Sequence, residues 1–140
     1  MFGCDICQEV CPVNVDAQPG DHPELELPEE RAGLDLAGLL ALPRAEYVEV
    51  FRGSPMKRSK LEGLQRNAAV VMGNSGSTRY LPALIRALEE GESVVKKHAA
   101  WALGRIGGPR ARTALNEAHI READGVVLAE IEAALEAESR

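Results

Sequence analysis

Three cysteines near the start of the chain are the residues best suited to chemistry. They are Cys4, Cys7 and Cys11, at the spacing C-x2-C-x3-C, and Pro12 follows the last of them. Their thiolates would be soft ligands, of the kind that bind iron–sulfur clusters and zinc. An odd number of cysteines, all within the first eleven residues, argues against a disulfide framework, which uses an even number. We therefore expect a reducing compartment and a metal or cluster role.

The proline after the third cysteine favours an iron–sulfur cluster. In bacterial ferredoxins the corresponding run is C-x2-C-x2-C-x3-C-P, and its final cysteine binds the other of two clusters. Cys4, Cys7 and Cys11 match the last three cysteines of that run. Because a cluster normally needs four thiolates, we expect the missing ligands to lie upstream. Met1 is accordingly interpreted as a truncation or a mis-assigned start.

Two alternatives stay open for these cysteines. A structural zinc site needs four ligands, and His22, across a proline-rich stretch, is the nearby candidate for the fourth. Alternatively, the three cysteines bind no metal in the isolated chain.

The charges are segregated along the chain, so the net charge of −6 is misleading. Residues 1–50 contain two basic and eleven acidic residues, whereas residues 51–112 contain twelve basic and four acidic residues, a net charge of +8. The last 28 residues return to −5. A basic central segment is the electrostatic footprint expected of a protein that binds a polyanion.

The second half of the sequence repeats itself. Residues 66–76 align with residues 97–107 at an offset of 31, since both begin with a basic residue, a polar residue and Ala-Ala, and both end with Gly-x-x-Gly. A partial third copy follows at an offset of 32, within residues 126–135. A period in the low thirties built of two helices is typical of an α-solenoid.

Composition and helix signals also predict an all-α fold. Aromatic residues make up only 4% of the chain, so the core must be built from Leu, Ala and Val, which favours helices over strands. We expect five to seven helices, with short ones at about 34–41 and 44–51. Ser93 is expected to cap a helix of the repeats, and Gly73 and Gly104 are expected to end helices.

The chain is predicted to have three segments. Residues 1–15 form the C-terminal part of a ferredoxin-like [4Fe–4S] segment, residues 16–33 form a proline-rich linker, and residues 34–140 form a HEAT-like helical-repeat domain. No stretch approaches the roughly 20 apolar residues that a membrane span requires, and the start lacks the features of a secretory signal. We therefore expect a cytoplasmic monomer that makes no contact with a membrane.

Four motifs, in this order, resemble the C-terminal third of epoxyqueuosine reductases. The first contains the cysteines, at residues 3–14, and the others lie at residues 51–58, 63–69 and 98–104. Together they cover most of the chain. The family usually has Trp where this chain has Val13, a departure that affects no expected ligand.

This resemblance implies a cofactor set and a reaction for the full-length protein. The family pairs cobalamin with two [4Fe–4S] clusters and reduces epoxyqueuosine to queuosine at the wobble position of tRNA. On this basis Cys4 and Cys7 are expected to bind the second cluster, and Cys11 the first. The cobalamin pocket and the catalytic acid of the family precede this segment. No catalytic residue is therefore assigned, and the chain alone is expected to be inactive.

The resemblance further implies that the helical repeats dock tRNA, and the basic segment supports this independently. Arg66 and Lys97 occupy equivalent repeat positions, and Lys97 and Arg105 lie on one side of a predicted helix. Such cations would position a nucleic acid without reading its sequence. The expected tRNA-binding residues are Lys57, Arg58, Lys60, Arg66, Lys96, Lys97 and Arg105.

Simpler interpretations compete with these. The cations could be solvated helix faces. Asn67 and His98 are expected to satisfy local groups rather than to contact RNA, and Trp101 is expected in the core. For the whole chain, the alternatives are an iron–sulfur electron-transfer protein with a helical scaffold for a partner, and a plain helical-repeat interaction module.

Overall fold

The computed structural model describes residues 6–17, 20 and 35–137. No strand occurs among these residues. Cys4, His22 and most of the expected linker at residues 16–33 lie outside them, so the division into three segments stays a prediction. No helix in the described part of the chain has the length and apolar character needed to cross a bilayer.

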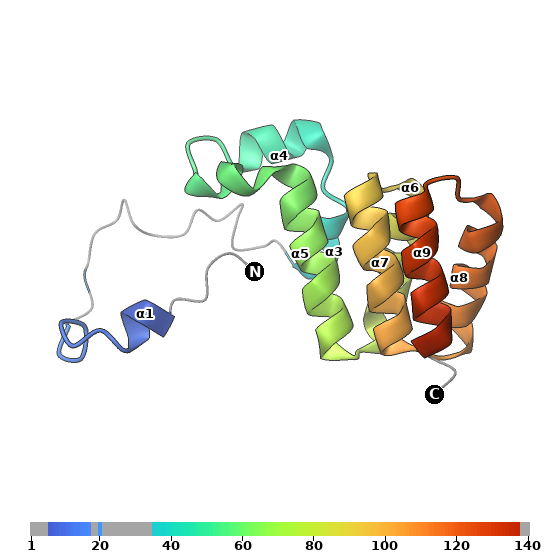
Figure 1. Ribbon diagram of the computed structural model, residues 1–140. Coiled ribbons are helices and arrows are strands. Elements are labelled where there is room, and N and C mark those ends of the chain that lie inside the picture. The colour runs from blue at the N-terminus through green and yellow to red at the C-terminus, as the bar shows by residue number, and fades with distance from the viewer. Residues whose placement is uncertain (1–5, 18–19, 21–34, 138–140) are drawn as a thin grey trace.

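Six helices of the repeat region form two layers (Figure 1). The front layer consists of α5 (Lys60–Ser75), α7 (Ser93–Ile106) and α9 (Gly125–Ala137). The back layer consists of α3 (Leu36–Leu40), α6 (Leu81–Glu90) and α8 (Pro109–Arg121). Within the front layer, α7 packs between α5 and α9. Paired layers with a repeat of about thirty residues make an α-solenoid, so the predicted all-α fold is confirmed.

Shorter elements connect these helices. A seventh helix, α4 (Arg44–Val50), and the 3-10 turn η2 (Pro55–Ser59) lead from α3 to α5, and the 3-10 turn η3 (Thr78–Tyr80) precedes α6. The part of the chain from residue 35 to residue 137 thus has seven α-helices, the upper limit of the expected five to seven, and α1 (Ile6–Glu9) is one more than that count. The short helices predicted at about 34–41 and 44–51 are α3 and α4.

Small and aliphatic side chains fill the space between the layers, as the composition predicts. Ala68 and Ala69 on α5, and Ala99 and Ala100 on α7, are fully buried. Because Ala has a short side chain, adjacent helices approach closely and the core stays dense with few aromatic residues. Trp101 is partly buried and packs against this core.

The prediction that Gly73 and Gly104 end helices is wrong. Both lie inside helices, and the helices end later, at Gly76 (φ 63°) and Gly107 (φ 70°). Glycine is favoured at these two ends because it adopts positive φ without a steric penalty.

Gly73 and Gly104 instead lie where front-layer helices meet. A Cβ added to Gly73 would lie 2.7 Å from Cζ3 of Trp101 on α7. A Cβ added to Gly104 would lie 2.7 Å from Cβ of Ala134 on α9. The two glycines are 31 residues apart, so the repeat preserves a close contact between neighbouring helices rather than a helix end.

The predicted cap at Ser93 is also wrong. Ser93 is the first residue of α7, the cap position is Glu92, and no side chain caps the helix there. The hydroxyl of Ser93 instead donates a hydrogen bond to Oδ2 of Asp124, before α9. The side chain therefore connects two repeats rather than capping its own helix.

Candidate nucleic-acid interface and cysteine segment

The helix α1 (Ile6–Glu9) positions two of the three expected metal ligands. Cys7 lies in this helix and is exposed, while Cys11 follows it and is half-buried; both are free thiols. The amide of Cys11 donates to the carbonyl of Gln8 at 3.3 Å, which continues the turn. Cys11 lies two residues beyond the end of α1, so the two thiols are close in the chain but belong to different elements, as their expected assignment to two different clusters requires. Cys4 lies outside the described residues.

The chain after Cys11 folds back on α1. The side-chain amide of Asn14 donates to the carbonyl of Gln8 at 2.9 Å, and the backbone amide of Asn14 donates to the carbonyl of Cys11 at 2.9 Å. Large apolar side chains in this segment are exposed by 57% to 83%, namely Ile6, Val10, Val13 and Val15.

The donor chemistry of this segment fits part of an iron–sulfur site. Cys7 and Cys11 supply two thiols, and the apolar side chains around them suit the hydrophobic shell that controls solvent access to a cluster. Across the described residues no group of three or more potential metal ligands is present. A complete site therefore needs Cys4 and further ligands, and the zinc alternative through His22 stays a hypothesis.

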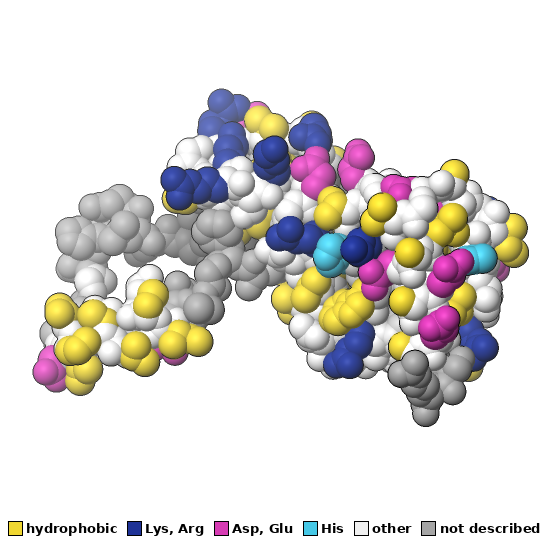
Figure 2. Space-filling view, in the orientation of Figure 1, with side chains coloured by type: hydrophobic (Ala, Val, Ile, Leu, Met, Phe, Trp, Pro, Cys, Tyr) yellow, Lys and Arg dark blue, Asp and Glu magenta, His cyan; other side chains and the backbone are white. Residues whose placement is uncertain are grey.

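Three of the expected RNA contacts form a corner between η2 and α5. Lys57 and Arg58 are exposed on η2, and Lys60 begins α5. Within the described chain none of the three has a carboxylate within ion-pair distance. Figure 2 shows dark-blue side chains gathered at this upper corner. We call Lys57, Arg58 and Lys60 the basic corner.

Local bonds hold the basic corner in place. The hydroxyl of Ser54 accepts from the amide of Met56 at 3.2 Å, and the hydroxyl of Tyr47 donates to the carbonyl of Lys57 at 3.3 Å. Lys60 has a φ of 55°, a left-handed conformation that is costly for a residue with a side chain. One local hydrogen bond and one from α4 thus fix the backbone of the corner.

An open hollow of about 650 Å³ lies beside this corner, between α4 and α5. Lys57, Lys60 and Arg44 line it, together with Glu62. A hydrogen bond from its own backbone amide, followed by the nearby Arg44, lowers the pKa of Glu62. Glu62 is therefore ionised at neutral pH and pairs with Arg44, while the charge of Lys60 also contributes to the lowered pKa. Of the cations that line the hollow, Lys57 is the one for which no described carboxylate is a partner.

The front face carries the remaining expected cations except Lys96. Arg66 on α5 donates to Oδ1 of Asn67 at 2.9 and 3.0 Å. Lys97 on α7 lies 3.8 Å from Oε2 of Glu130 on α9. Arg105, eight residues further along α7, lies 6.0 Å from the ring centroid of Trp101. The structure thus places Arg66 and Lys97 at equivalent positions of adjacent helices, with Arg105 on the same side as Lys97.

His98 and Asn67 both make local contacts, as predicted, but of different kinds. Nδ1 of His98 lies 2.8 Å from the carbonyl of Val94, one turn earlier in α7, so it satisfies a local backbone group. Asn67 binds the guanidinium of Arg66. It therefore orients an expected phosphate contact.

Lys96 lies apart from this face. Its Nζ donates to Oε2 of Glu122 at 2.9 Å, and the side chain lines a small hollow between the layers with Leu88 and Ala118. Sequence reasoning missed Glu122 and Glu130 as partners of neighbouring lysines. The signal for them was the acidic character of the last 28 residues.

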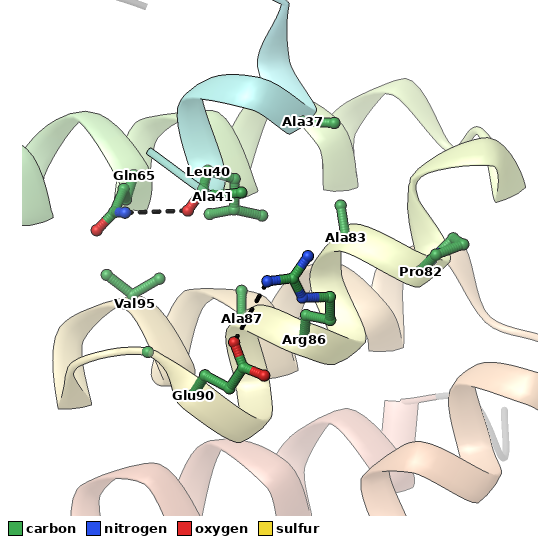
Figure 3. Close-up of a pocket in the computed structure, with 11 residues that line it drawn as sticks. Ala37, Leu40, Ala41, Gln65, Pro82, Ala83, Arg86, Ala87, Glu90 and Val95 are labelled. Atoms are coloured by element: carbon green, nitrogen blue, oxygen red, sulfur yellow. Dashed lines mark hydrogen bonds and ion pairs between the residues drawn. The ribbon is translucent and has the colours of Figure 1, made fainter. Parts of the chain in front are cut away.

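A further hollow, of about 390 Å³, opens between α3 and α6 on the back layer (Figure 3). Its walls are mostly apolar, and its polar groups bind one another: Gln65 donates to the carbonyl of Leu40 at 3.0 Å, and Arg86 pairs with Glu90 at 3.5 Å. No nucleophile with an adjacent base is among the residues that line it. This hollow therefore has no arrangement suited to acid–base or nucleophilic catalysis.

Comparison with protein families matches residues 56–136 to HEAT repeats. The chain belongs to the HEAT-repeat family. The match begins within η2 and extends almost to the end of α9, so it includes the basic corner and both layers from α5 onward. The predicted HEAT-like domain is confirmed for this region.

The HEAT-repeat chain is also similar to longer proteins named epoxyqueuosine reductase. It is 38% identical to the one from Xanthomonas campestris pv. campestris over 76% of this chain and 30% of the relative. It is 34% identical to the one from Bacillus subtilis over 97% of this chain and 36% of the relative. The chain thus spans about a third of the length of these relatives, and the predicted resemblance is confirmed.

Solved structures agree with this similarity. A crystal structure of epoxyqueuosine reductase with an epoxyqueuosine-modified tRNA-Tyr stem loop superposes with a TM-score of 0.89, at 33% identity, over 99% of this chain and 37% of that one. The Bacillus subtilis epoxyqueuosine reductase gives a TM-score of 0.86 at 34% identity, over 97% of this chain and 37% of that one. Nearly all of the HEAT-repeat chain therefore has a counterpart in these enzymes.

Proposed function

We propose that this chain is the C-terminal segment of an epoxyqueuosine reductase, an oxidoreductase that converts epoxyqueuosine to queuosine in tRNA. The observation that carries the proposal is the similarity over nearly the whole chain to a relative solved with a modified tRNA stem loop. The role assigned to this segment is to supply cluster ligands and a docking surface for tRNA. A cytoplasmic location and a monomeric state go with this proposal.

The cysteine segment would hold iron–sulfur clusters. Cys7 and Cys11, with Cys4, are the thiols that would bind iron, and the clusters would supply single electrons when bound. The exposed Val10 and Val13 beside these thiols would then be covered by the remainder of the site. Cobalamin belongs, by the resemblance, to the part of the enzyme that precedes this segment, and no residue of this chain is assigned to it.

The HEAT repeats would hold tRNA through its phosphates. The basic corner presents three cations for which no ion pair occurs among the described residues, and Arg66, Lys97 and Arg105 extend positive charge across the front face. Contacts of this kind fix the position of an RNA and make its affinity depend steeply on salt. Lys96, which is bound to Glu122, is the weakest member of the proposed set.

A chimera tests the proposal. The matching segment of the Bacillus subtilis enzyme is replaced by this chain, and conversion of epoxyqueuosine in tRNA is measured by nucleoside analysis. We expect the chimera to be active and to lose both its cluster absorption and its activity on Cys7→Ser or Cys11→Ser. A folded chimera that holds its clusters and binds tRNA, yet converts no epoxyqueuosine, would contradict the assignment. Full cluster content in both serine variants would show that Cys7 and Cys11 are not cluster ligands.

A further inference from the structure

Four arginines gather at one end of the HEAT repeats. The α5–α6 and α7–α8 connections lie together at the lower end in Figure 1. The arginines of these connections and of the adjoining helix ends are all exposed: Arg79, Arg105, Arg110 and Arg112. We call them the basic end. Of its members, only Arg105 belongs to the cations already assigned to RNA binding.

Among the described residues, no carboxylate forms an ion pair with these guanidinium groups. Arg79 lies 4.5 Å from the ring centroid of Tyr80 and donates to its hydroxyl, and Arg105 lies over Trp101. Arg110 and Arg112 form no ion pair with any carboxylate in the described part of the chain. Glu136, in the last turn of α9, is the acidic residue described at this end. The positive charge here is therefore available to an external anion.

Arginines further along the same two back-layer helices differ from the basic end. They are ion-paired, Arg86 with Glu90 and Arg121 with Glu89 and Glu117. In the described part of the back layer, unpaired arginines therefore gather where α6 and α8 begin, and such a cluster creates a local positive potential that attracts polyanions.

The repeat makes the basic end regular. Arg79 and Arg110 are 31 residues apart, and each lies at the start of a back-layer helix. Arg79 lies two residues before Leu81, the first residue of α6, and Arg110 directly follows Pro109, the first residue of α8. Equivalent residues of adjacent repeats lie side by side. Two guanidinium groups at a fixed spacing suit the regular phosphates of a nucleic-acid strand.

Arg105 connects the basic end to the front face. It lies in the last turn of α7, about 12 Å along the helix from Lys97 at 1.5 Å per residue. Figure 2 shows two separate groups of dark-blue side chains at the lower edge of the repeats. Arg105 therefore links the front face to this end through α7.

We propose that the basic end is a second phosphate-binding surface for the bound tRNA, reached through Arg105 and carried mainly by Arg79 and Arg110. This inference rests on the proposed function, because it takes RNA as the polyanion. Arginine suits the role because its planar guanidinium binds phosphate oxygens in a bidentate manner. Arg112, on the same helical turn as Arg110, adds charge to this surface.

Charge reversal at matched positions tests the inference. Arg79→Glu with Arg110→Glu is compared with Arg86→Glu and Arg121→Glu, a control pair that makes the same change of total charge at ion-paired positions further along the same helices. Binding of full-length epoxyqueuosine-modified tRNA to the 140-residue chain is measured from about 50 to 300 mM salt, a range over which phosphate contacts change affinity strongly. Circular dichroism checks folding. We expect the first pair to weaken binding by roughly tenfold and to reduce the slope of log K against log salt by about 2, one for each phosphate that is no longer neutralised.

A third pair, Arg66→Glu with Lys97→Glu on the front face, separates the possible failures. Equal binding by the basic-end pair and the ion-paired control pair, with weaker binding by the front-face pair, would overturn this inference and leave tRNA docking in place. Unchanged binding by all three pairs would overturn both.

Discussion

Nζ of Lys96 lies 2.9 Å from Oε2 of Glu122, which joins the first turn of α7 to the connection between α8 and α9. The Glu122 side chain is only 12% exposed and that of Lys96 is 24% exposed. The next residue, Lys97, points to the front face and reaches Glu130 at the longer distance of 3.8 Å. Two adjacent lysines therefore have different roles, one in holding repeats together and one at the proposed interface.

Substitution of these two lysines should separate stability from binding. We expect Lys96→Ala to lower the free energy of unfolding by about 1–2 kcal/mol, because it leaves a largely buried carboxylate without its charged donor. Lys97→Ala should cost at most about 0.5 kcal/mol, since its ion pair is long and more exposed. Urea denaturation measures both losses of stability. In tRNA binding we expect the opposite, with Lys97→Ala weakening the affinity more than Lys96→Ala. Equal stabilities of the two variants would contradict the structural role of Lys96.

The acidic groups that follow α8 should make stability depend on pH. A hydrogen bond from the Asp124 amide, followed by the one from Lys96, lowers the pKa of Glu122. The hydroxyl of Ser93, followed by the Val126 amide, lowers the pKa of Asp124. Both folded-state values thus lie below the unfolded values of about 4.3 for Glu and 3.9 for Asp. The stability they provide is therefore complete above those values and is lost as the pH falls through the lowered ones.

Urea denaturation at pH 7, 5, 4 and 3 measures this dependence. Glu122→Gln should lower stability at pH 7 and flatten the loss below pH 5, because the amide does not titrate. Glu117→Gln is the matched control: Glu117 is exposed and 3.9 Å from Arg121. A Glu122→Gln variant with the same pH dependence as the parent would contradict the assignment.

The close contact of α5 with α7 can be tested at two glycines of one helix. Gly73→Ala places its Cβ 2.7 Å from Trp101 and 2.9 Å from the backbone Cα of Ala102, so the helices must separate. We expect a loss of about 1–2 kcal/mol, because overpacking outweighs the helix propensity gained. Gly63→Ala meets nothing nearer than 3.7 Å and should stabilise by up to about 1 kcal/mol. Thermal and urea unfolding compare the two, and a stabilised Gly73→Ala would show that the helices are not in tight contact.

The front face should account for much of the salt-dependent RNA affinity. Arg66→Glu with Lys97→Glu is expected to weaken binding of epoxyqueuosine-modified tRNA and to reduce the salt slope by about 2. Filter binding or fluorescence anisotropy measures both quantities. Asn67→Ala, which frees the guanidinium of Arg66 without removing charge, should weaken binding less and leave the slope unchanged. If the double variant binds as the parent does, the front face takes no part in docking.

The repeat offset of 31 was enough to predict an α-solenoid and the equivalent placement of Arg66 and Lys97. Periodicity carries this information because each repeat buries the same side of its helices. Periodicity could not predict the hydrogen bond from Ser93 to Asp124, since several nearby acidic residues could have accepted it. The prediction that Gly73 ends a helix was wrong because a glycine near a helix end usually indicates a cap. Only the position of the neighbouring helix shows that this glycine permits a close contact.

The same distinction between sequence pattern and tertiary packing applies to the candidate site. Residue types identified the thiols and the basic segment, whereas tertiary packing decided which cations remain unpaired. The sequence alone did not separate Lys96 from Lys97, because the choice depends on carboxylates 26 and 33 residues away that belong to the next repeat.

These carboxylates have a mechanical consequence. Glu122 and Glu130 both belong to the last helical pair, so movement of α8 and α9 away from α7 would break both lysine contacts together. The remaining helices would then be less stable and would carry more unpaired positive charge. Separation of the last helical pair would therefore strengthen the electrostatic attraction for RNA while destabilising the helices that position the bound RNA.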